Sequence, residues 1–161
     1  MGEQTGRPYT LPSEAQWEKA ARGTDGRIYP WGNEWDEAKV NKYSTSVSEL
    51  EPVGQRPDGT SPYGAFNMGD SVPEWVEGNY GPYPGSTVDL PFTVVRQYDI
   101  KVSRGALVGI GPTTHRNAYR ADMLVDFTGF RCTQGPERVP LEETVVEILT
   151  WPTPEPATEP D

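Results

Sequence analysis

The stretch LPSEAQWEKAARG, from Leu11 to Gly23, carries the local signals of an amphipathic helix at both of its ends. Ser13 is a favourable N-cap residue, and Gln16 three residues later completes a capping box. An acidic residue follows the cap and basic residues precede the end, which suits the helix dipole. Gly23 is the residue type expected just after the last turn. The residues that share one face of this predicted helix and should be buried are Trp17, Ala20 and Ala21.

Outside this helix the chain is rich in turn-forming residues. It has 161 residues, of which 34% are hydrophobic, with 17 glycines and 17 prolines spread without a period. This length suggests one domain with a tail, and the composition indicates irregular loops rather than a collagen-like repeat. The helix and the expected strands together predict a loop-rich α+β fold. Those strands are Glu74–Glu77, Phe92–Val102, Arg116–Arg120 and Phe127–Cys132.

Charge and cysteine content narrow the classes of function. The formal net charge of −10 makes nucleic acid and anionic membranes unfavourable partners, although it is compatible with cation binding. No run of residues is long and apolar enough to span a bilayer. The chain has one cysteine, Cys132, which excludes an internal disulfide and a CxxC metal site.

An aromatic loop, YPWGNEW, occupies residues 29–35. Two tryptophans around a Pro/Gly turn fit a loop that is anchored to the core by its aromatic rings. Stacking against a sugar is the alternative. Aromatic anchors in long loops more often serve packing, so we favour the anchor.

A second loop, AFNMGDSVPEW from Ala65 to Trp75, combines oxygen-bearing side chains with glycine and proline. Asn67 and Glu74 can supply side-chain oxygens, and the backbone between them can supply carbonyls. Hard cations such as Ca²⁺ take ligands of these kinds. On residue types alone an ordinary surface loop is favoured over a metal site, because acidic loops are common in so acidic a chain.

Taken in order, several motifs resemble the formylglycine-generating enzyme or sulfatase-modifying-factor family. This resemblance implies a loop-rich variant of the C-type lectin fold, and we place the domain at residues 1–135. The motifs are LPSEAQWEKAARG at Leu11–Gly23, YPWGNEWD at Tyr29–Asp36, PVG at Pro52–Gly54, SPYGAFN with EW at Ser61–Asn67 and Glu74–Trp75, RGALV at Arg104–Val108, RNAYR at Arg116–Arg120 and GFRC at Gly129–Cys132.

Two departures from the family pattern bear on function. Family domains normally begin upstream of the helix with strands, for which we find no counterpart, so we expect a fragment or a minimal version with an exposed sheet edge. Catalytic members also carry a cysteine pair that binds copper, and copper(I) selects thiolates. The matching interval Ala106–Tyr119 has no cysteine, and the nearest positions are Ile110 and His115. The resemblance is therefore to the branch without cysteines, and copper is not expected.

The family's calcium site matches this sequence better than its copper site does. The resemblance implies as ligands the Asn67 side chain, the backbone carbonyls of Asp70 and Val72, and the Glu74 side chain. Asp70 replaces the usual glycine and adds a carboxylate. A second family calcium site would begin at Asn41, but its later aspartate has no clear equivalent. With the resemblance we favour structural calcium over a bare loop.

The sequence gives less support to other candidate site residues. His115, Arg104 and Arg116 could face a ligand, although pairing with nearby acids explains the arginines more simply. Some relatives make sulfoxides with a three-histidine iron site on another domain, which one histidine cannot build. We expect Cys132 to be buried and unreactive.

The C-terminal residues are expected to lie outside the domain. Residues 136–151 predict a weak amphipathic helix, and residues 152–161 form a Pro/Thr/Glu tail that should be disordered. This tail weakly favours an exported or cell-surface protein, and the compartment is otherwise open.

Three hypotheses remain open. We favour a non-catalytic, calcium-stabilised scaffold that presents Gly109–His115 and neighbouring loops to a protein or glycan. The alternative is an oxidase that converts a substrate cysteine to formylglycine. The third is a fragment whose partner is the missing N-terminal segment, or another domain joined through the tail.

Overall fold

The computed structural model describes residues 8–41, 50–87, 98–105, 111–123, 125 and 128–135 of the chain. The expected helix at 136–151, the expected tail at 152–161 and most of the expected strand Phe92–Val102 lie outside these residues. The described elements are short and are joined by long loops, as a loop-rich α+β fold requires. They are β1 (Tyr9–Thr10), α2 (Glu14–Arg22), the 3₁₀ turns η1 (Glu37–Lys39) and η3 (Pro57–Gly59), β2 (Glu74–Asn79), β3 (Ile100–Arg104), β4 (Arg116–Arg120), β5 (Gly129–Phe130) and β6 (Thr133–Gln134).

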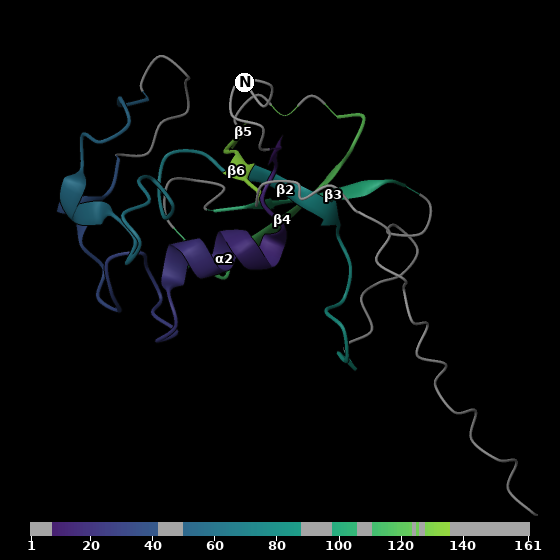
Figure 1. Ribbon diagram of the computed structural model, residues 1–161, viewed down its shortest axis with the longest axis horizontal. Coiled ribbons are helices and arrows are strands. Elements are labelled where there is room, and N and C mark those ends of the chain that lie inside the picture. Colours follow the sequence, from purple (N-terminus) through teal and green to yellow (C-terminus); the bar gives the residue numbers. More distant parts are fainter. Residues whose placement is uncertain are drawn as a thin grey trace, which may run out of the picture.

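The main sheet has four strands in the order β4-β3-β2-β5. β3 pairs antiparallel with both β2 and β4, whereas β5 pairs parallel with β2. β1 and β6 form a separate antiparallel ribbon. Figure 1 shows α2 beside the strands, with the loops that carry η1 and η3 forming a lobe beyond its C-terminal end.

The helix prediction is confirmed in its bounds and its buried face. The Gln16 backbone N–H donates to Ser13 Oγ at 3.2 Å, and the Ser13 N–H donates to Gln16 Oε1 at 2.8 Å, so the capping box is closed. Gly23 follows the last turn with a φ of 69°. Ala20 is only partly buried. The core beneath the helix contains Trp17, Ala21, Met68, Val76 and Val102.

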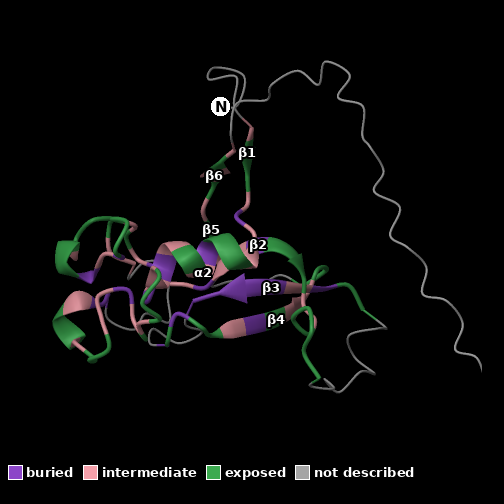
Figure 2. Cartoon of the chain, turned by 60° about the horizontal axis from the view of Figure 1, so that its bottom comes forward, coloured by how far each residue is buried: buried purple, intermediate pink, exposed green. Residues whose placement is uncertain are grey.

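β3 lies at the centre of this arrangement. Figure 2 shows it buried along most of its length between β2 and β4, with α2 turning its exposed side away from the sheet. Among the described residues, no helix is both long enough and apolar enough to pass through a bilayer.

Two strand predictions need correction. The strand expected to reach Cys132 is only Gly129–Phe130, and Cys132 is exposed rather than buried. Its position explains this, because it lies in the link between β5 and β6, which belong to different sheets. The second correction concerns the strand predicted at Phe92–Val102. In its described part the strand begins at Ile100, since Tyr98 and Asp99 are not in a strand. The predicted strands at 74–77 and 116–120 are confirmed as β2 and β4.

The aromatic loop is anchored by packing. Tyr29 and Trp31 stack with ring centroids 5.3 Å apart, and Trp35 meets both rings edge-on. Pro30 between them is buried and lies against Gly69. These contacts support the anchor interpretation, and they join the loop to the turn that precedes β2.

This contact makes Gly69 intolerant of any side chain. A Cβ atom at Gly69 would lie 2.7 Å from Pro30 Cδ, which is too close for a carbon–carbon contact. We expect Gly69→Ala to lower the free energy of unfolding by about 1–3 kcal/mol through overpacking, measured by urea denaturation. Gly81→Ala is the matched control, because a Cβ there meets nothing within 4 Å. Equal stability of the two variants would contradict this packing.

Candidate functional site

The turn between Asn67 and Glu74 is irregular. Asn67 and Ser71 have φ angles of 56° and 71°, in the left-handed region that few residues other than glycine adopt. Met68 is buried in the core and fixes the turn from below. The backbone is therefore held in a conformation that costs free energy locally.

The side-chain amide of Asn67 is hydrogen-bonded through its nitrogen but not through its oxygen. Its Nδ2 faces the Asp70 carboxylate, 3.3 Å from Oδ1 and 3.4 Å from Oδ2, whereas its own Oδ1 is buried without a hydrogen-bond partner. The reverse amide orientation would place Oδ1 against a carboxylate. The unsatisfied atom is therefore an oxygen, and leaving such an acceptor buried costs about 1–3 kcal/mol.

Asp70 joins this turn to the loop before it. The Asn41 backbone N–H donates to Asp70 Oδ2 at 2.5 Å, and both residues are buried. Burial raises the pKa of the Asp70 carboxyl above its ordinary value, although the hydrogen bonds from Asn41 and Asn67 oppose this shift. Asn41 Nδ2 is also buried without a partner.

Glu74, the first residue of β2, is held by two partners from distant parts of the chain. Trp17 Nε1 donates to Glu74 Oε2 at 2.7 Å. Arg131 makes a bidentate pair, with Nη2 2.7 Å from Oε1 and Nε 2.5 Å from Oε2. This pair could not be predicted from local sequence patterns, because its partners are 57 positions apart. A metal at Glu74 would have to share the carboxylate with Arg131.

A hollow of ≈ 390 Å³ brings some of the predicted ligands together. Asn67, Val72 and Glu74 line it, whereas Asp70 does not. Arg131 also lines it. Around the turn and its hollow, the acidic side chains of Glu51, Asp70 and Glu74 outnumber the basic side chains of Arg56 and Arg131 by one, which favours a cation.

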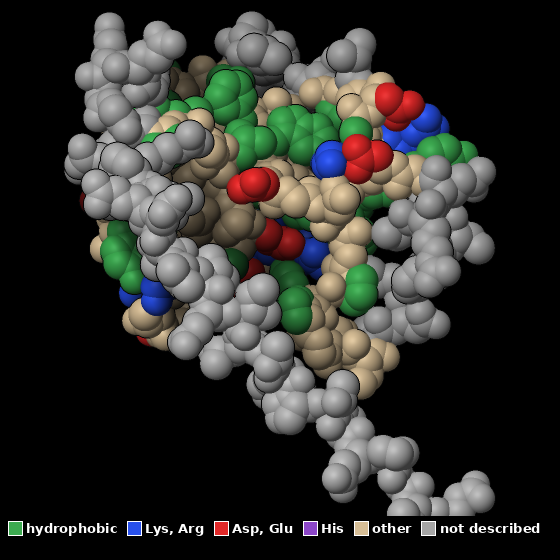
Figure 3. Space-filling model, turned by 45° about the vertical axis from the view of Figure 1, so that its right-hand side comes forward, with side chains coloured by type: hydrophobic (Ala, Val, Ile, Leu, Met, Phe, Trp, Pro, Cys, Tyr) green, Lys and Arg blue, Asp and Glu red, His purple; other side chains and the backbone are tan. Residues whose placement is uncertain are grey.

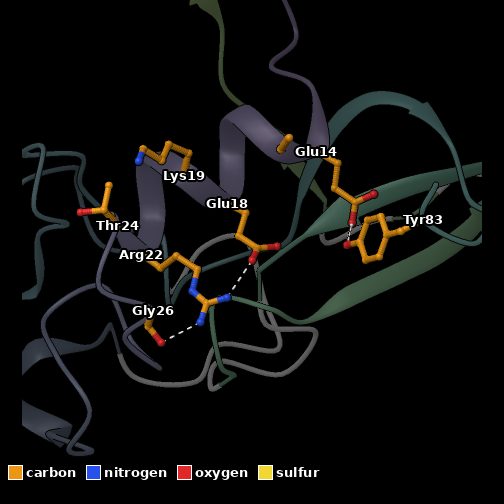
Figure 4. A pocket seen from close by; sticks show the side chains of 9 residues that line it. Glu14, Glu18, Lys19, Arg22, Thr24, Gly26 and Tyr83 are labelled. Carbon is orange, nitrogen blue, oxygen red and sulfur yellow. Dashed lines mark hydrogen bonds and ion pairs between the residues drawn. The ribbon is translucent and has the colours of Figure 1, made fainter. Parts of the chain in front are cut away.

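A second hollow, of ≈ 500 Å³, is lined by residues of α2, of the turn that follows it and by Tyr83. Figure 4 shows Glu14, Glu18 and Arg22 along it, with Tyr83 at one end. The Tyr83 hydroxyl donates to Glu14 Oε1 at 2.8 Å, and Arg22 Nη1 donates to Glu18 Oε1 at 2.9 Å. Two of its acidic side chains are thus paired with neighbours in the hollow, Glu18 with Arg22 and Glu14 with Tyr83.

Glu14 is the common acceptor of this cluster. Arg104 Nη1 donates to it at 2.6 Å, and Arg116 donates through Nε at 2.5 Å and Nη2 at 2.9 Å. Burial raises the pKa of Glu14, but the hydrogen bonds from Arg116, Tyr83 and Arg104 outweigh burial and lower it below the ordinary value. Glu14 is therefore a structural anion.

The two arginines predicted as possible ligand-facing residues lie within this cluster. The side chain of Arg104 is 0% exposed and also donates to Glu18 Oε2 at 2.6 Å and to the Thr113 carbonyl at 2.7 Å, so it faces the interior. Arg116 lies over the rings of Tyr80 and Tyr83. The expected pairing of arginines with acids is confirmed, and Figure 3 shows basic side chains beside acidic ones on one face.

His115 lies apart from both hollows. It is exposed, and its Nε2 is 3.0 Å from Asn117 Oδ1. The loop before it is anchored at Thr113, since the Thr113 backbone N–H donates to the Ile28 carbonyl at 2.8 Å. Residues 106–110 of the cysteine-free interval lie outside the described part of the chain.

Comparison with known proteins agrees with this architecture. A family model described as the sulfatase-modifying factor enzyme 1-like domain matches residues 1–135. "Inactive C-alpha-formylglycine-generating enzyme 2" of Bos taurus is 29% identical over 143 residues, covering 82% of this chain and 46% of that protein. "Hercynine oxygenase" of Mycolicibacterium smegmatis is 31% identical over 121 residues, covering 68% of this chain and 28% of that protein.

A solved structure shows the same fold. PvdO from Pseudomonas aeruginosa superposes with a TM-score of 0.60 at 24% identity, covering 83% of this chain and 55% of PvdO. The chain thus spans about half the length of the bovine relative and 28% of the length of the mycobacterial one. Since the family model covers most of its residues, the chain belongs to the sulfatase-modifying factor enzyme 1-like (FGE-sulfatase) domain family.

Proposed function

We propose that this domain is a non-catalytic, calcium-stabilised scaffold of the lectin-like type, which binds a protein or glycan ligand. The observation that carries the calcium part is the buried Asn67 Oδ1 without a partner, at the turn where the family resemblance implies a calcium ligand. A cation there would relieve the cost of the unsatisfied acceptor. The similarity to an inactive formylglycine-generating enzyme supports the non-catalytic part.

The residues fit calcium in part. Asn67 Oδ1, the carbonyls of Asp70 and Val72 and the Glu74 carboxylate would hold the ion, with water completing the six to eight oxygen ligands that Ca²⁺ takes. Bound calcium would supply a divalent charge that fixes the turn to β2. Arg131 would have to yield part of the Glu74 carboxylate, since its guanidinium repels a cation.

Calcium should raise the melting temperature of the protein. A ligand that binds only the folded state stabilises it by about 2.7 kcal/mol at a concentration about 100 times its Kd. Thermal unfolding in calcium and in chelator measures this shift. Asn67→Gly should abolish it, because glycine tolerates the φ of 56° but has no amide oxygen.

Asn67→Asp is the companion variant, because it keeps an oxygen at the position of Oδ1. It also replaces the amide that donates to Asp70 with a second carboxylate, so it should be less stable than the wild type in chelator. It should retain a calcium-dependent shift. Two results would count against the site. One is a wild-type melting temperature that does not change with calcium, and the other is a calcium-dependent shift in Asn67→Gly as large as in the wild type.

The alternative function, oxidation of a substrate cysteine to formylglycine, is disfavoured by the cysteine count. Copper(I) prefers thiolates, and Cys132 is the chain's one cysteine. We expect no conversion of a sulfatase-derived cysteine peptide to the aldehyde in the presence of copper, as followed by mass spectrometry. Copper-dependent turnover that survives Cys132→Ser would overturn the non-catalytic proposal.

A further inference from the structure

The guanidinium of Arg131 joins the two ends of the turn that carries the candidate cation site. Its Nη2 donates to the Phe66 carbonyl at 3.1 Å and to Glu74 Oε1 at 2.7 Å. Phe66 precedes Asn67, and Glu74 ends the turn. A cation held by Asn67 Oδ1 and the Glu74 carboxylate would join the same two ends. The protein therefore already places a positive charge of its own across this turn.

Little of the Glu74 carboxylate is left for another partner. An ionised carboxylate offers about four acceptor positions. Arg131 takes two of them, through Nε to Oε2 and through Nη2 to Oε1, and Trp17 Nε1 takes a third. The Glu74 side chain is only 12% exposed, so water screens weakly the repulsion between the guanidinium and a second cation at the same oxygens.

We propose that Arg131 is a built-in competitor of calcium, which sets how tightly the turn binds the ion. The guanidinium leaves Glu74 when the ion binds, a step that rests on the proposed calcium site. The apparent affinity of a ligand falls with the fraction of molecules in which its site is open. A bidentate arginine–carboxylate pair is strong, so it keeps this fraction small.

Arg131 can leave Glu74 without disturbing the core. Its side chain is 27% exposed, and it lies in the link between β5 and β6 rather than among the core residues. Water can replace the partner of a partly exposed guanidinium. The buried Arg104 side chain, which is 0% exposed, has no such freedom.

A purely structural ion pair is the alternative. In that case Arg131 holds Glu74 whether or not calcium is present, and removing it lowers the melting temperature without changing the calcium affinity. Competition instead predicts that the loss of Arg131 weakens the fold and tightens calcium binding together.

Isothermal titration of calcium into the chelator-treated, full-length protein separates these two roles. Arg131→Gln removes the competing charge and should bind calcium more tightly than the wild type, by a factor on the order of ten or more, as the loss of hydrogen bonds between charged groups allows. In chelator this variant should melt below the wild type, and calcium should restore most of the difference. Arg131→Lys keeps the charge but cannot form the bidentate pair, so its affinity should lie between the two. It carries the test if the glutamine variant does not fold.

Arg56→Gln is the matched control. Arg56 forms the same kind of pair with Glu51, with Nη2 2.6 Å from Oε1 and Nε 2.9 Å from Oε2, and its side chain is 28% exposed. The change removes the same charge near the turn but leaves the contacts of Glu74 in place. Its calcium affinity should therefore stay much closer to that of the wild type.

Three results would contradict the inference in different ways. Equal calcium affinity in the wild type and in Arg131→Gln would overturn the competitor role and leave the calcium site standing. An equal gain in Arg56→Gln would also overturn it, because the loss of any nearby charge would then suffice. No binding by either the wild type or Arg131→Gln would reject the calcium site of the proposed function, and the competitor role with it.

Discussion

Replacing Arg104 with methionine is expected to lower the free energy of unfolding by about 3 kcal/mol or more, as the removal of one partner from a buried ion pair does. The guanidinium of Arg104 joins Glu14 and Glu18 of α2 to the Thr113 carbonyl. Methionine fills much of the volume but removes the side-chain donor to the Thr113 carbonyl and one of the donors to each carboxylate. Arg116 and Arg22 still contact Glu14 and Glu18. Urea denaturation followed by circular dichroism measures the loss.

Arg120→Met is the matched control for this prediction. Arg120 also pairs with an acid, Asp122, but its side chain is 42% exposed. Water can replace an exposed partner, so this change should have a much smaller effect. If both variants were equally stable, the Arg104 cluster would not hold α2 to the rest of the protein.

Replacing Trp17 with alanine is expected to cost about 3–5 kcal/mol, the range for truncating a buried aromatic side chain. Trp17 is buried in the core, lies beneath the Arg104 guanidinium, and donates its indole N–H to Glu74. The change therefore opens a cavity and also removes a hydrogen bond at the candidate cation site. Thermal and urea unfolding measure the loss.

Trp35→Ala is the comparison, because Trp35 is exposed and meets its aromatic neighbours edge-on. We expect a loss of about 1 kcal/mol, typical of an aromatic pair. Trp17→Phe separates the two effects at Trp17, since it keeps most of the packing and loses the bond to Glu74. A stable Trp17→Ala variant would contradict the assignment of the core.

The helix α2 could be predicted from the sequence because its signals are local. Its cap, its dipole pattern and its buried face depend on residues within one or two turns of each other, and such local signals are readable from sequence. The same motif carried the family resemblance. The bond from Trp17 to Glu74 could not be read in this way, because it joins positions 57 residues apart.

The candidate site was predictable only in part, for the same reason. Counting along the family motif identified Asn67 and Glu74, and the structure places both beside one hollow. It could not reveal that Arg131 occupies the Glu74 carboxylate, or that Asp70 binds the backbone of Asn41. The exposure of Cys132 was mispredicted because a short motif does not say where the sheet ends.

The structure also connects the core to the site. Glu74 begins β2, accepts a hydrogen bond from the core residue Trp17, and forms an ion pair with Arg131 after β5. A cation at Glu74 would therefore act on the junction of the helix and the sheet. This is how calcium binding at one turn could stabilise the whole domain.

Isothermal titration of calcium into the chelator-treated protein tests the central claim most directly. We predict saturable binding of about one Ca²⁺ per chain, which is lost in Asn67→Gly and kept in Asn67→Asp. No measurable binding by the wild type, or equal binding by Asn67→Gly, would contradict the assignment of this turn as a cation site.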